Sequence, residues 1–338
     1  MSREEKIASF DPNSAADESG GIYGLPFDLD EAQVVIVPVP WDVTVSYRDG
    51  ASGGPDAILN ASLQVDLYDP SVKDAWKIGL AMDDISTEVA HESSRYRALA
   101  VGEGADEDQA SVNAASAWLN EWVERRCGGW LDAGKLVALL GGDHSTPLGF
   151  MKALAKRHSS FGILQIDAHA DLRDAYDGFD FSHASIMRNA LKIPEISTLV
   201  QAGIRDYCDE EAEVIATDTR VKTFFDRDLK HERFAGANWA EQTNKIVNAL
   251  PSKVYISFDI DGLDPKLCPN TGTPVAGGFE FEEAAYLIEA VAKSGRTIIG
   301  LDLNEVSRAD AASEWDANVG ARLLYRMCNL MALSNKRA

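Results

Sequence analysis

The sequence predicts an α/β protein in which a mostly parallel sheet is covered by helices on both faces. Short apolar runs alternate with longer amphipathic segments along the 338 residues, which is the pattern of successive β–α–β units. No linker-like segment divides the chain, and no fixed-period repeat occurs. We therefore expect one large domain over residues 33–338. Residues 1–32, in which Gly20, Gly21 and Pro26 interrupt any periodicity, are expected to form an N-terminal arm.

The expected elements follow from hydrophobic periodicity. Seven apolar runs are predicted to be strands: 34–39, 136–141, 161–167, 197–203, 220–225, 253–259 and 297–303. Seven amphipathic segments are predicted to be helices: 55–67, 108–126, 146–158, 183–192, 238–249, 280–293 and 316–333. Residues 82–110 have the weakest periodicity, so we expect a surface excursion there, with the acidic stretch 103–108 exposed to solvent.

The composition limits the classes of partner and compartment. A net charge of −22 argues against binding to nucleic acid or to an anionic membrane, although it would attract a cationic substrate; solubility alone also explains it. No apolar run is long enough to cross a bilayer, and residues 1–20 lack the apolar core of a secretory signal. The cysteines Cys127, Cys208, Cys268 and Cys328 are scattered, which favours reduced thiols in a cytoplasmic protein.

The segment Asp167-Ala168-His169-Ala170-Asp171 follows an apolar run and carries three residues that commonly bind metals. In extended backbone, residues two apart point to the same side, so the two carboxylates and the imidazole share one face. Such groups repel or desolvate one another unless a cation lies between them. Alone, this pattern fits a metal site and a solvated loop equally well.

Two further clusters follow apolar runs in the same way: Gly141-Gly142-Asp143-His144-Ser145 and Ser257-Phe258-Asp259-Ile260-Asp261-Gly262-Leu263-Asp264-Pro265. Taken singly, each aspartate could cap a helix or close a turn. Because the carboxyl ends of parallel strands meet at one edge of a sheet, we expect the three clusters to converge there. The residues expected to bind metal are His144, Asp167, His169, Asp171, Asp259 and Asp261.

Two imidazoles and four carboxylates are too many ligands for one structural zinc ion, which takes four and favours cysteine. They suit two divalent ions of the hardness of Mn²⁺, with some carboxylates shared. Such ions can lower the pKa of bound water to around 7 and so produce a nucleophile at neutral pH. Calcium is a competing interpretation, but imidazole is a poor calcium ligand. A magnesium-dependent phosphoryl-transfer site is another, yet no Walker-type loop accompanies the aspartates.

The three clusters, in this order and at these separations, resemble the metal-binding motifs of the ureohydrolase family of arginases and agmatinases. Thr271-Gly272-Thr273-Pro274 and Gly300-Leu301-Asp302-Leu303-Asn304-Glu305-Val306 are similar to the closing motifs of the same family. The resemblance covers residues 34–330. It implies a three-layer α/β/α fold with a mostly parallel eight-stranded sheet, residues 33–338 being the ureohydrolase catalytic domain. The implied activity is metal-dependent hydrolysis of the C–N bonds of linear amidines.

The resemblance also implies a role for each ligand by its motif position. His144 and Asp171 would bind one ion, His169 and Asp261 the other, and Asp167 and Asp259 would bridge the two. The bridging hydroxide would attack a guanidinium carbon, and the resulting tetrahedral intermediate would collapse to urea and an amine. The implied cofactors are two divalent ions, Mn²⁺ or Ni²⁺.

Two more residues match catalytic positions of the family. Glu305 matches the carboxylate that holds the guanidinium, a planar cation that can donate two parallel N–H bonds. His183 matches the loop histidine that transfers a proton, which suits a side chain that titrates near neutrality. Without the resemblance, a turn carboxylate and a structural histidine would be the favoured interpretations.

The resemblance leaves the substrate open, and agmatinase-like hydrolysis of a small cationic guanidino compound is the first hypothesis. Arginases hold the amino acid end of arginine with a Ser-Gly-Asn run, which residues 172–180 of this chain lack. Arg173 could hold a substrate carboxylate, as in a guanidino-acid hydrolase or a formiminoglutamase. The alternative for Arg173 is a surface ion pair with Asp174 or Asp177.

A further alternative is a small pocket for free guanidine, alkylated guanidines or biguanides. Residues 182–187 and 314–320 are similar to a branch with that activity, whose members favour nickel, and Trp315 would then wall the pocket by stacking on the guanidinium. A non-catalytic subunit is also conceivable, but such a chain should have lost ligands. The family implies a homo-oligomer, a trimer or hexamer, with a hetero-oligomer as the alternative.

Overall fold

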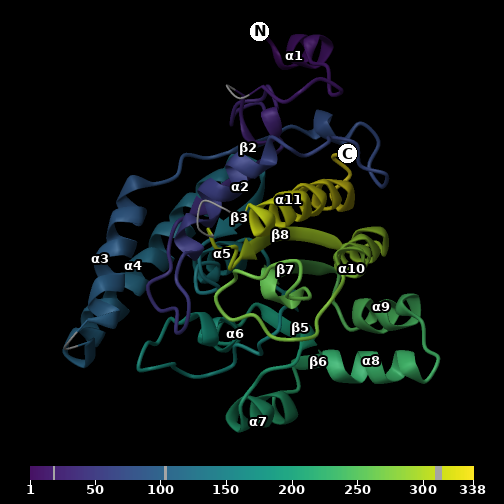
Figure 1. Ribbon diagram of the computed structural model, residues 1–338. Coiled ribbons are helices and arrows are strands. Elements are labelled where there is room, and N and C mark those ends of the chain that lie inside the picture. Colours follow the sequence, from purple (N-terminus) through teal and green to yellow (C-terminus); the bar gives the residue numbers. More distant parts are fainter. Residues whose placement is uncertain (18–19, 103–104, 309–313) are drawn as a thin grey trace.

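The computed structural model describes residues 1–17, 20–102, 105–308 and 314–338 (Figure 1). A single sheet lies at the centre with helices on both faces, which confirms the predicted α/β/α layers. Of the acidic stretch 103–108, expected to be exposed to solvent, residues 103 and 104 and the side chains of residues 105–107 lie outside the described part of the chain, and Asp108 is partly exposed.

The sheet is parallel throughout its described pairs, with the strand order β2-β1-β3-β8-β7-β4-β5-β6. Its strands are β1 (Val34–Val39), β2 (Leu80–Met82), β3 (Leu136–Gly141), β4 (Phe161–Ile166), β5 (Ile196–Ile204), β6 (Val221–Phe225), β7 (Lys253–Asp259) and β8 (Thr297–Asn304). The seven strands predicted from apolar runs are confirmed. The eighth, β2, is too short to give a periodic signal and lies at the edge of the sheet.

The helices are distributed over both faces of the sheet. They are α1 (Arg3–Ser9), α2 (Gly54–Ser62), α3 (Thr87–Val101), α4 (Ala105–Asp132), α5 (Leu148–Ala155), α6 (Ile186–Ala190), α7 (Asp209–Thr217), α8 (Asp226–Phe234), α9 (Trp239–Asn248), α10 (Phe281–Lys293) and α11 (Trp315–Ser334). Helices α2, α9, α10 and α11 pack on one face. Helices α4, α5 and α6 pack on the other.

Strand β1 shows why both faces need cover. Its residues Val34 and Ile36 belong to the core of one face, whereas Val35, Val37 and Val39 belong to the core of the other, and all five are completely buried. A strand covered on both sides reads as a continuous apolar run rather than as an alternating one. This burial accounts for the short, unbroken apolar runs in the sequence.

The surface excursion expected at residues 82–110 is mainly helical. Helix α3 occupies most of this region, and the side chain of Ser86 caps it by accepting a hydrogen bond from the N–H of Val89. Only Val89 and Ser93 of α3 are buried, so the helix lacks the apolar stripe that would have predicted it. Helices α7 and α8 were missed for the same reason, since both are mainly polar.

The N-terminal segment contacts the C-terminal helix. The hydroxyl of Tyr23 donates a 2.9 Å hydrogen bond to the carbonyl oxygen of Ala321, and the Tyr23 ring lies 4.9 Å from that of Tyr325. The boundary at residue 32 stays a prediction. All four cysteines are free, and within the described residues no helix is long and apolar enough to cross a membrane.

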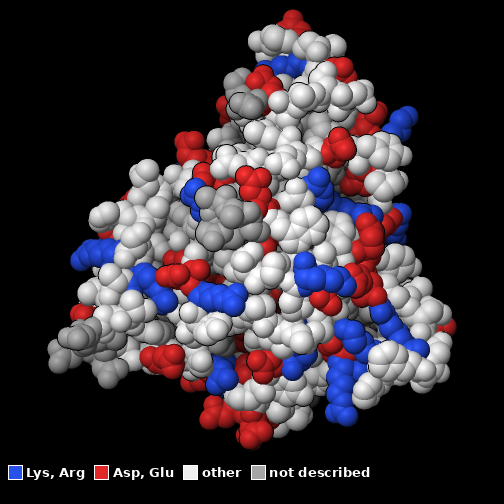
Figure 2. All heavy atoms as spheres, viewed as in Figure 1, with Lys and Arg blue, Asp and Glu red and all other residues white. Residues whose placement is uncertain are grey.

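Charged side chains are mixed on the face shown in Figure 2, where acidic and basic residues lie side by side. Acidic side chains gather at its lower end, over α7, whose first turn contains Asp209, Glu210 and Glu211. Acidic residues in the first turn interact favourably with the positive end of the helix dipole.

Candidate metal centre and active-site pocket

Four neighbouring strands, β3, β8, β7 and β4, carry the candidate site at their carboxyl ends. His144 follows β3, Asp167 follows β4, Asp259 ends β7, and Glu305 follows β8. The N–H of His144 donates a 2.9 Å hydrogen bond to Oε1 of Glu305, which is 161 positions away in the chain. The predicted convergence of strand ends therefore occurs.

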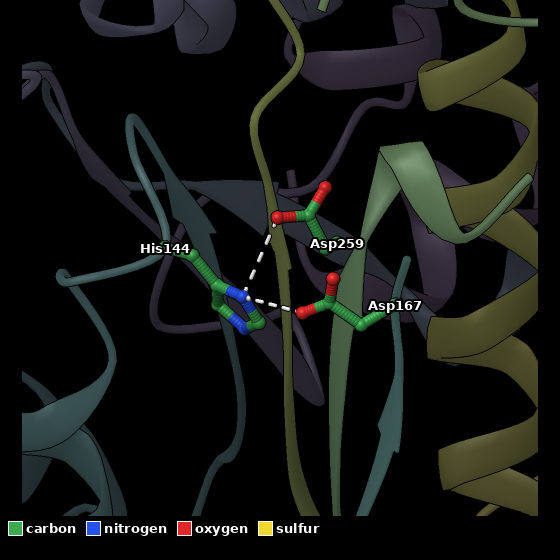
Figure 3. A group of neighbouring side chains, drawn as sticks. All are labelled: His144, Asp167 and Asp259. Carbon is green, nitrogen blue, oxygen red and sulfur yellow. Dashed lines mark ion pairs between the residues drawn. The ribbon is translucent and has the colours of Figure 1, made fainter. Parts of the chain in front are cut away.

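The first ligand group surrounds His144. Its Nδ1 lies 3.0 Å from Oδ2 of Asp167 and 3.4 Å from Oδ2 of Asp259 (Figure 3). Oδ2 of Asp171 also lies 3.0 Å from Nδ1 of His144. His144 is only 1% exposed, and no acceptor is aligned to take a hydrogen bond from Nδ1. This nitrogen therefore faces three carboxylates without a hydrogen-bond partner of its own.

The other side of the His144 ring is fixed by a buried hydrogen-bonded pair. Nε2 of His144 lies 2.9 Å from Oγ of Ser257, and this hydroxyl donates a 3.0 Å bond to Oδ1 of Asp302. Because the Ser257 hydrogen is used in that bond, its oxygen accepts from Nε2–H. In its neutral form, the ring then has its lone pair on Nδ1, the nitrogen that faces the carboxylates.

The second ligand group surrounds His169. Its Nδ1 lies 3.0 Å from Oδ2 of Asp261 and 3.7 Å from Oδ1 of Asp167. Asp167 thus belongs to both groups and presents one carboxylate oxygen to each histidine. The His169 side chain is 25% exposed, and its Nε2 lies 3.9 Å from Oδ2 of Asp206. One face of this group is therefore open.

Several carboxyl groups of the cluster are held where ionisation is unfavourable. Burial and the nearby Asp167 raise the pKa of Asp171 to about 7, and burial with Asp261 raises the pKa of Asp259 well above its usual range. Burial also acts on Asp261, but the charge of His169 and its hydrogen bond outweigh it and lower the pKa of that carboxyl. A cation bound between these carboxyls would reduce their mutual repulsion and favour their ionised form.

The residues present fit a pair of divalent ions. Within each group, the ligand atoms lie within 4.8 Å of one another, and each group contains one imidazole and two carboxylates. The unpartnered Nδ1 of buried His144 is an orphaned polar atom of the kind that a metal satisfies. Nitrogen and oxygen donors in this ratio suit Mn²⁺ or similar ions better than Ca²⁺.

The backbone at the site is held in uncommon conformations. Asp171 and Glu305 have positive φ angles of 55° and 63°, which non-glycine residues rarely adopt and which cluster at functional sites. The carbonyl oxygen of Asp171 accepts hydrogen bonds from the N–H groups of Met187 and Arg188, at 3.1 Å each. Gly142 has no room for a side chain, because a Cβ there would collide with the backbone of Trp41.

A cavity of about 470 Å³ opens beside the cluster and is lined by His169, Asp171 and His183, among others. Nε2 of His183 lies 3.4 Å from Oγ of Ser46, and Tyr176 meets its ring edge-on at a centroid distance of 5.9 Å. Burial, with the positive charges of His169 and His144, lowers the pKa of His183 to about 4. At neutral pH this imidazole is uncharged.

Glu305 is buried behind the cluster, at 5% exposure. Besides the N–H of His144, it contacts Thr271, whose hydroxyl donates a 2.9 Å bond to the Glu305 carbonyl oxygen. Burial and the neighbouring carboxyl of Asp143 raise the pKa of Glu305 well above its usual range. A cation beside this carboxyl would stabilise its charged form.

A sequence description of the arginase family matches residues 32–329. The chain belongs to the arginase family. N(1)-aminopropylagmatine ureohydrolase of Synechocystis sp. is 30% identical over 313 residues, covering 91% of this chain and 92% of the relative. Agmatinase of Bacillus anthracis is 31% identical over 281 residues, covering 82% and 85%. The crystal structure of a hypothetical agmatinase from Burkholderia thailandensis gives a TM-score of 0.73 at 25% identity, covering 96% and 93%.

Membership confirms the resemblance and the arginase-like fold. The family consists of binuclear metal enzymes, and this arginase-family chain is a hydrolase of the C–N bonds of amidino groups. The roles of the individual residues, the identity of the metal and the substrate stay predictions.

Two residues considered for substrate binding in this arginase-family chain lie differently from expectation. Arg173 does line the cavity, but it contacts Glu211 at 3.9 Å and stacks on Tyr176 at 4.9 Å, so its expected pairing with Asp174 or Asp177 is wrong. Trp315 is not among the described residues that line the cavity; it is 49% exposed, and its indole N–H donates to the Lys266 carbonyl oxygen.

Other residues of the pocket were not predicted. Asp206 follows β5 as the candidate metal ligands follow their strands, so the rule that sites form at strand ends could have identified it. Ser46, Tyr47 and Arg48 come from the loop after β1, which has no acidic or histidine cluster. Ser257 belongs to the cluster that contains Asp259 and Asp261, but nothing in the sequence indicates its buried hydrogen bond to His144.

Proposed function

We propose that this arginase-family enzyme hydrolyses the guanidino group of an amine-tailed substrate of the agmatine type to urea and an amine. The observation that carries the proposal is Asp167, which belongs to two ligand groups beside a cavity that also contains His183. His144 and Asp171 would hold one Mn²⁺ or Ni²⁺ ion, His169 and Asp261 the other, with Asp167 and Asp259 as bridges. When bound, such ions lower the pKa of a water molecule to around 7 and supply the nucleophile.

Glu305 is proposed to hold the guanidinium group. A carboxylate can accept two parallel N–H bonds from that planar cation, and among the described residues the N–H of His144 engages Oε1 of Glu305 and no donor engages Oε2. The buried position of Glu305 makes a lone negative charge costly, so a cationic substrate compensates it. Binding and correct orientation of the guanidinium would thus be favoured together.

His183 is proposed to move the proton that the leaving amine needs. Its imidazole is uncharged at neutral pH, so one ring nitrogen can take up a proton while the other donates. Ser46 and Tyr176 hold the ring at the wall of the cavity. His183 can therefore transfer a proton without being charged before the reaction.

Asp206 is proposed to receive the ammonium group at the far end of the substrate. Its carboxylate is 68% exposed at the cavity wall, next to His169. A cavity of about 470 Å³ has the size typical of sites for whole small molecules, roughly 300–1,000 Å³, and exceeds what a single guanidine molecule would fill. Together with Trp315 lying outside the cavity, this favours a tailed substrate over free guanidine.

A urea-release assay tests the proposal. The substrates are agmatine, arginine, guanidinobutyrate, formiminoglutamate, guanidine and metformin, each with Mn²⁺ and with Ni²⁺. We expect agmatine to be hydrolysed most efficiently, and Asp206→Asn to lower its kcat/KM about threefold to fivefold, the size of an exposed ion pair. Asp174→Asn, exposed outside this cavity, is the matched control. Absence of urea from every metal-loaded reaction would instead favour a non-catalytic subunit.

A guanidino acid is the second candidate, favoured by Arg48. This side chain lines the cavity, stacks near Tyr47 at 5.5 Å and donates to the Pro269 carbonyl oxygen, but no carboxylate pairs with it among the described residues. An unpaired guanidinium suits a carboxylate tail. If guanidinobutyrate is the better substrate, Arg48→Gln should reduce its turnover and leave that of agmatine unchanged.

A further inference from the structure

Three polar side chains form a hydrogen-bonded line across neighbouring strands β4, β5 and β6. The Thr223 hydroxyl donates to Oε1 of Gln201 at 2.7 Å, and Nε2 of Gln201 donates to Oε1 of Gln165 at 2.7 Å. Nε2 of Gln165 then donates to Oδ2 of Asp167 at 2.8 Å. Gln165 and Gln201 are completely buried, and Thr223 is half-buried. The line therefore runs from the side of the sheet to the carboxylate shared by both ligand groups.

The Asp167 carboxylate, at the end of this line, determines which group donates and which accepts in the bonds between the side chains. The ionised carboxylate of Asp167 can only accept, so Gln165 must turn its NH₂ group toward it. The oxygen of Gln165 then faces Gln201 and must receive an N–H from it. The second hydrogen of each amide is also used: that of Gln165 on the His169 carbonyl oxygen at 3.1 Å, and that of Gln201 on the Ala170 carbonyl oxygen at 2.8 Å.

Buried amides are costly unless fully bonded, and interior strand positions usually hold apolar side chains. Here both amides are satisfied, and three of their bonds end on the segment that contains Asp167, His169 and Asp171. The line also sets the rotation of the Asp167 carboxylate. Its Oδ2 is held toward His144, while its Oδ1 accepts the N–H of His169 at 2.6 Å.

We propose that Gln165 and Gln201 are positioning residues that orient Asp167 and the segment after it so that one carboxylate serves both metal ions. The proposal rests on the proposed role of Asp167 as a bridging ligand. Neither amide touches the substrate cavity; each acts through the residue it holds.

Calorimetric titration of the metal-stripped protein with Mn²⁺ tests this role. Wild type should bind two ions. Gln165→Leu should weaken the binding of both at least about tenfold, the effect typical of groups that orient ligands. The matched control is Gln242→Leu in α9, another completely buried amide, which donates to the Leu229 carbonyl oxygen far from the site. It should leave Mn²⁺ affinity unchanged.

Thr223→Val provides a milder test in case Gln165→Leu does not fold. It removes only the donor that orients Gln201, so Mn²⁺ affinity should fall severalfold, and Thr223→Ser should restore it. Wild-type affinity in Gln165→Leu, or in Thr223→Val, overturns the positioning role while the proposed function stands. A wild-type protein that binds no divalent ion overturns both.

Discussion

The two ligand groups have the same composition but different surroundings. His144 is buried, and Ser257 and Asp302 fix the side of its ring away from the carboxylates. His169 is partly exposed and borders the cavity, where its second nitrogen lies 3.9 Å from Asp206. A histidine fixed on both sides is preorganised for its ion, and a histidine beside a cavity can adjust to a ligand. The comparison teaches that, in the proposed metal centre, the buried half would retain its ion and the half beside the cavity would be accessible to a ligand.

The largest effect is expected where the two halves meet. Asp167→Ala should remove both ions and reduce urea release to background, because Asp167 belongs to both groups. Asp259→Ala gives the informative contrast, since Asp259 is grouped with His144 alone. If Asp259 bridges the two ions, Asp259→Ala should also lose both of them. Metal analysis showing one retained ion after Asp259→Ala would limit it to the buried half.

The histidines should differ in their effect on stability. In the metal-free protein, His144→Ala leaves the buried carboxylates without their partner and should cost about 3–5 kcal/mol of unfolding free energy. His169→Ala should cost less, because water reaches its ring. Denaturant unfolding of both chelator-treated variants measures the difference, and equal losses would contradict the distinction between a buried and an accessible half.

The smallest effect is a pH dependence of the stabilisation by metal. The pKa of Asp171 is raised to about 7 in the fold, so its contribution to the stability of the metal-free protein is present at low pH and is lost as pH rises through about 7. Bound metal needs the ionised carboxyl, so its affinity changes in the opposite direction. The increase in Tm on adding Mn²⁺ should therefore be larger at about pH 8 than at about pH 6. An increase that shrinks with pH would contradict the raised pKa.

The layers and the convergence of the candidate ligands could be predicted because both leave a pattern in the sequence. The buried strands are unbroken apolar runs, and acidic or histidine clusters follow three of them. The supporting residues leave no such pattern. Gln165 and Ser257 are single polar residues within apolar runs, and their partners Gln201 and Asp302 lie far away in the chain. Only the register of the strands brings each pair together.

The substrate end of the site was predictable to a smaller extent. Asp206 follows a strand end as the ligands do, but a lone aspartate there has many ordinary explanations. Arg173 could not be placed from the sequence, because its partner Glu211 lies on another element and not among its chain neighbours. Helix α3 was missed because only two of its residues are buried.

The place of β8 in the sheet has a consequence for how the enzyme is made. This strand is the last in the chain, yet it lies between β3 and β7. During synthesis, a chain that ends before residue 297 contains His144 and His169 but lacks the strand that joins the two halves of the sheet. Pairings between distant segments form slowly, since the intervening loop must first be closed. The four strand ends that carry the candidate site can therefore come together only after β8 has been synthesised.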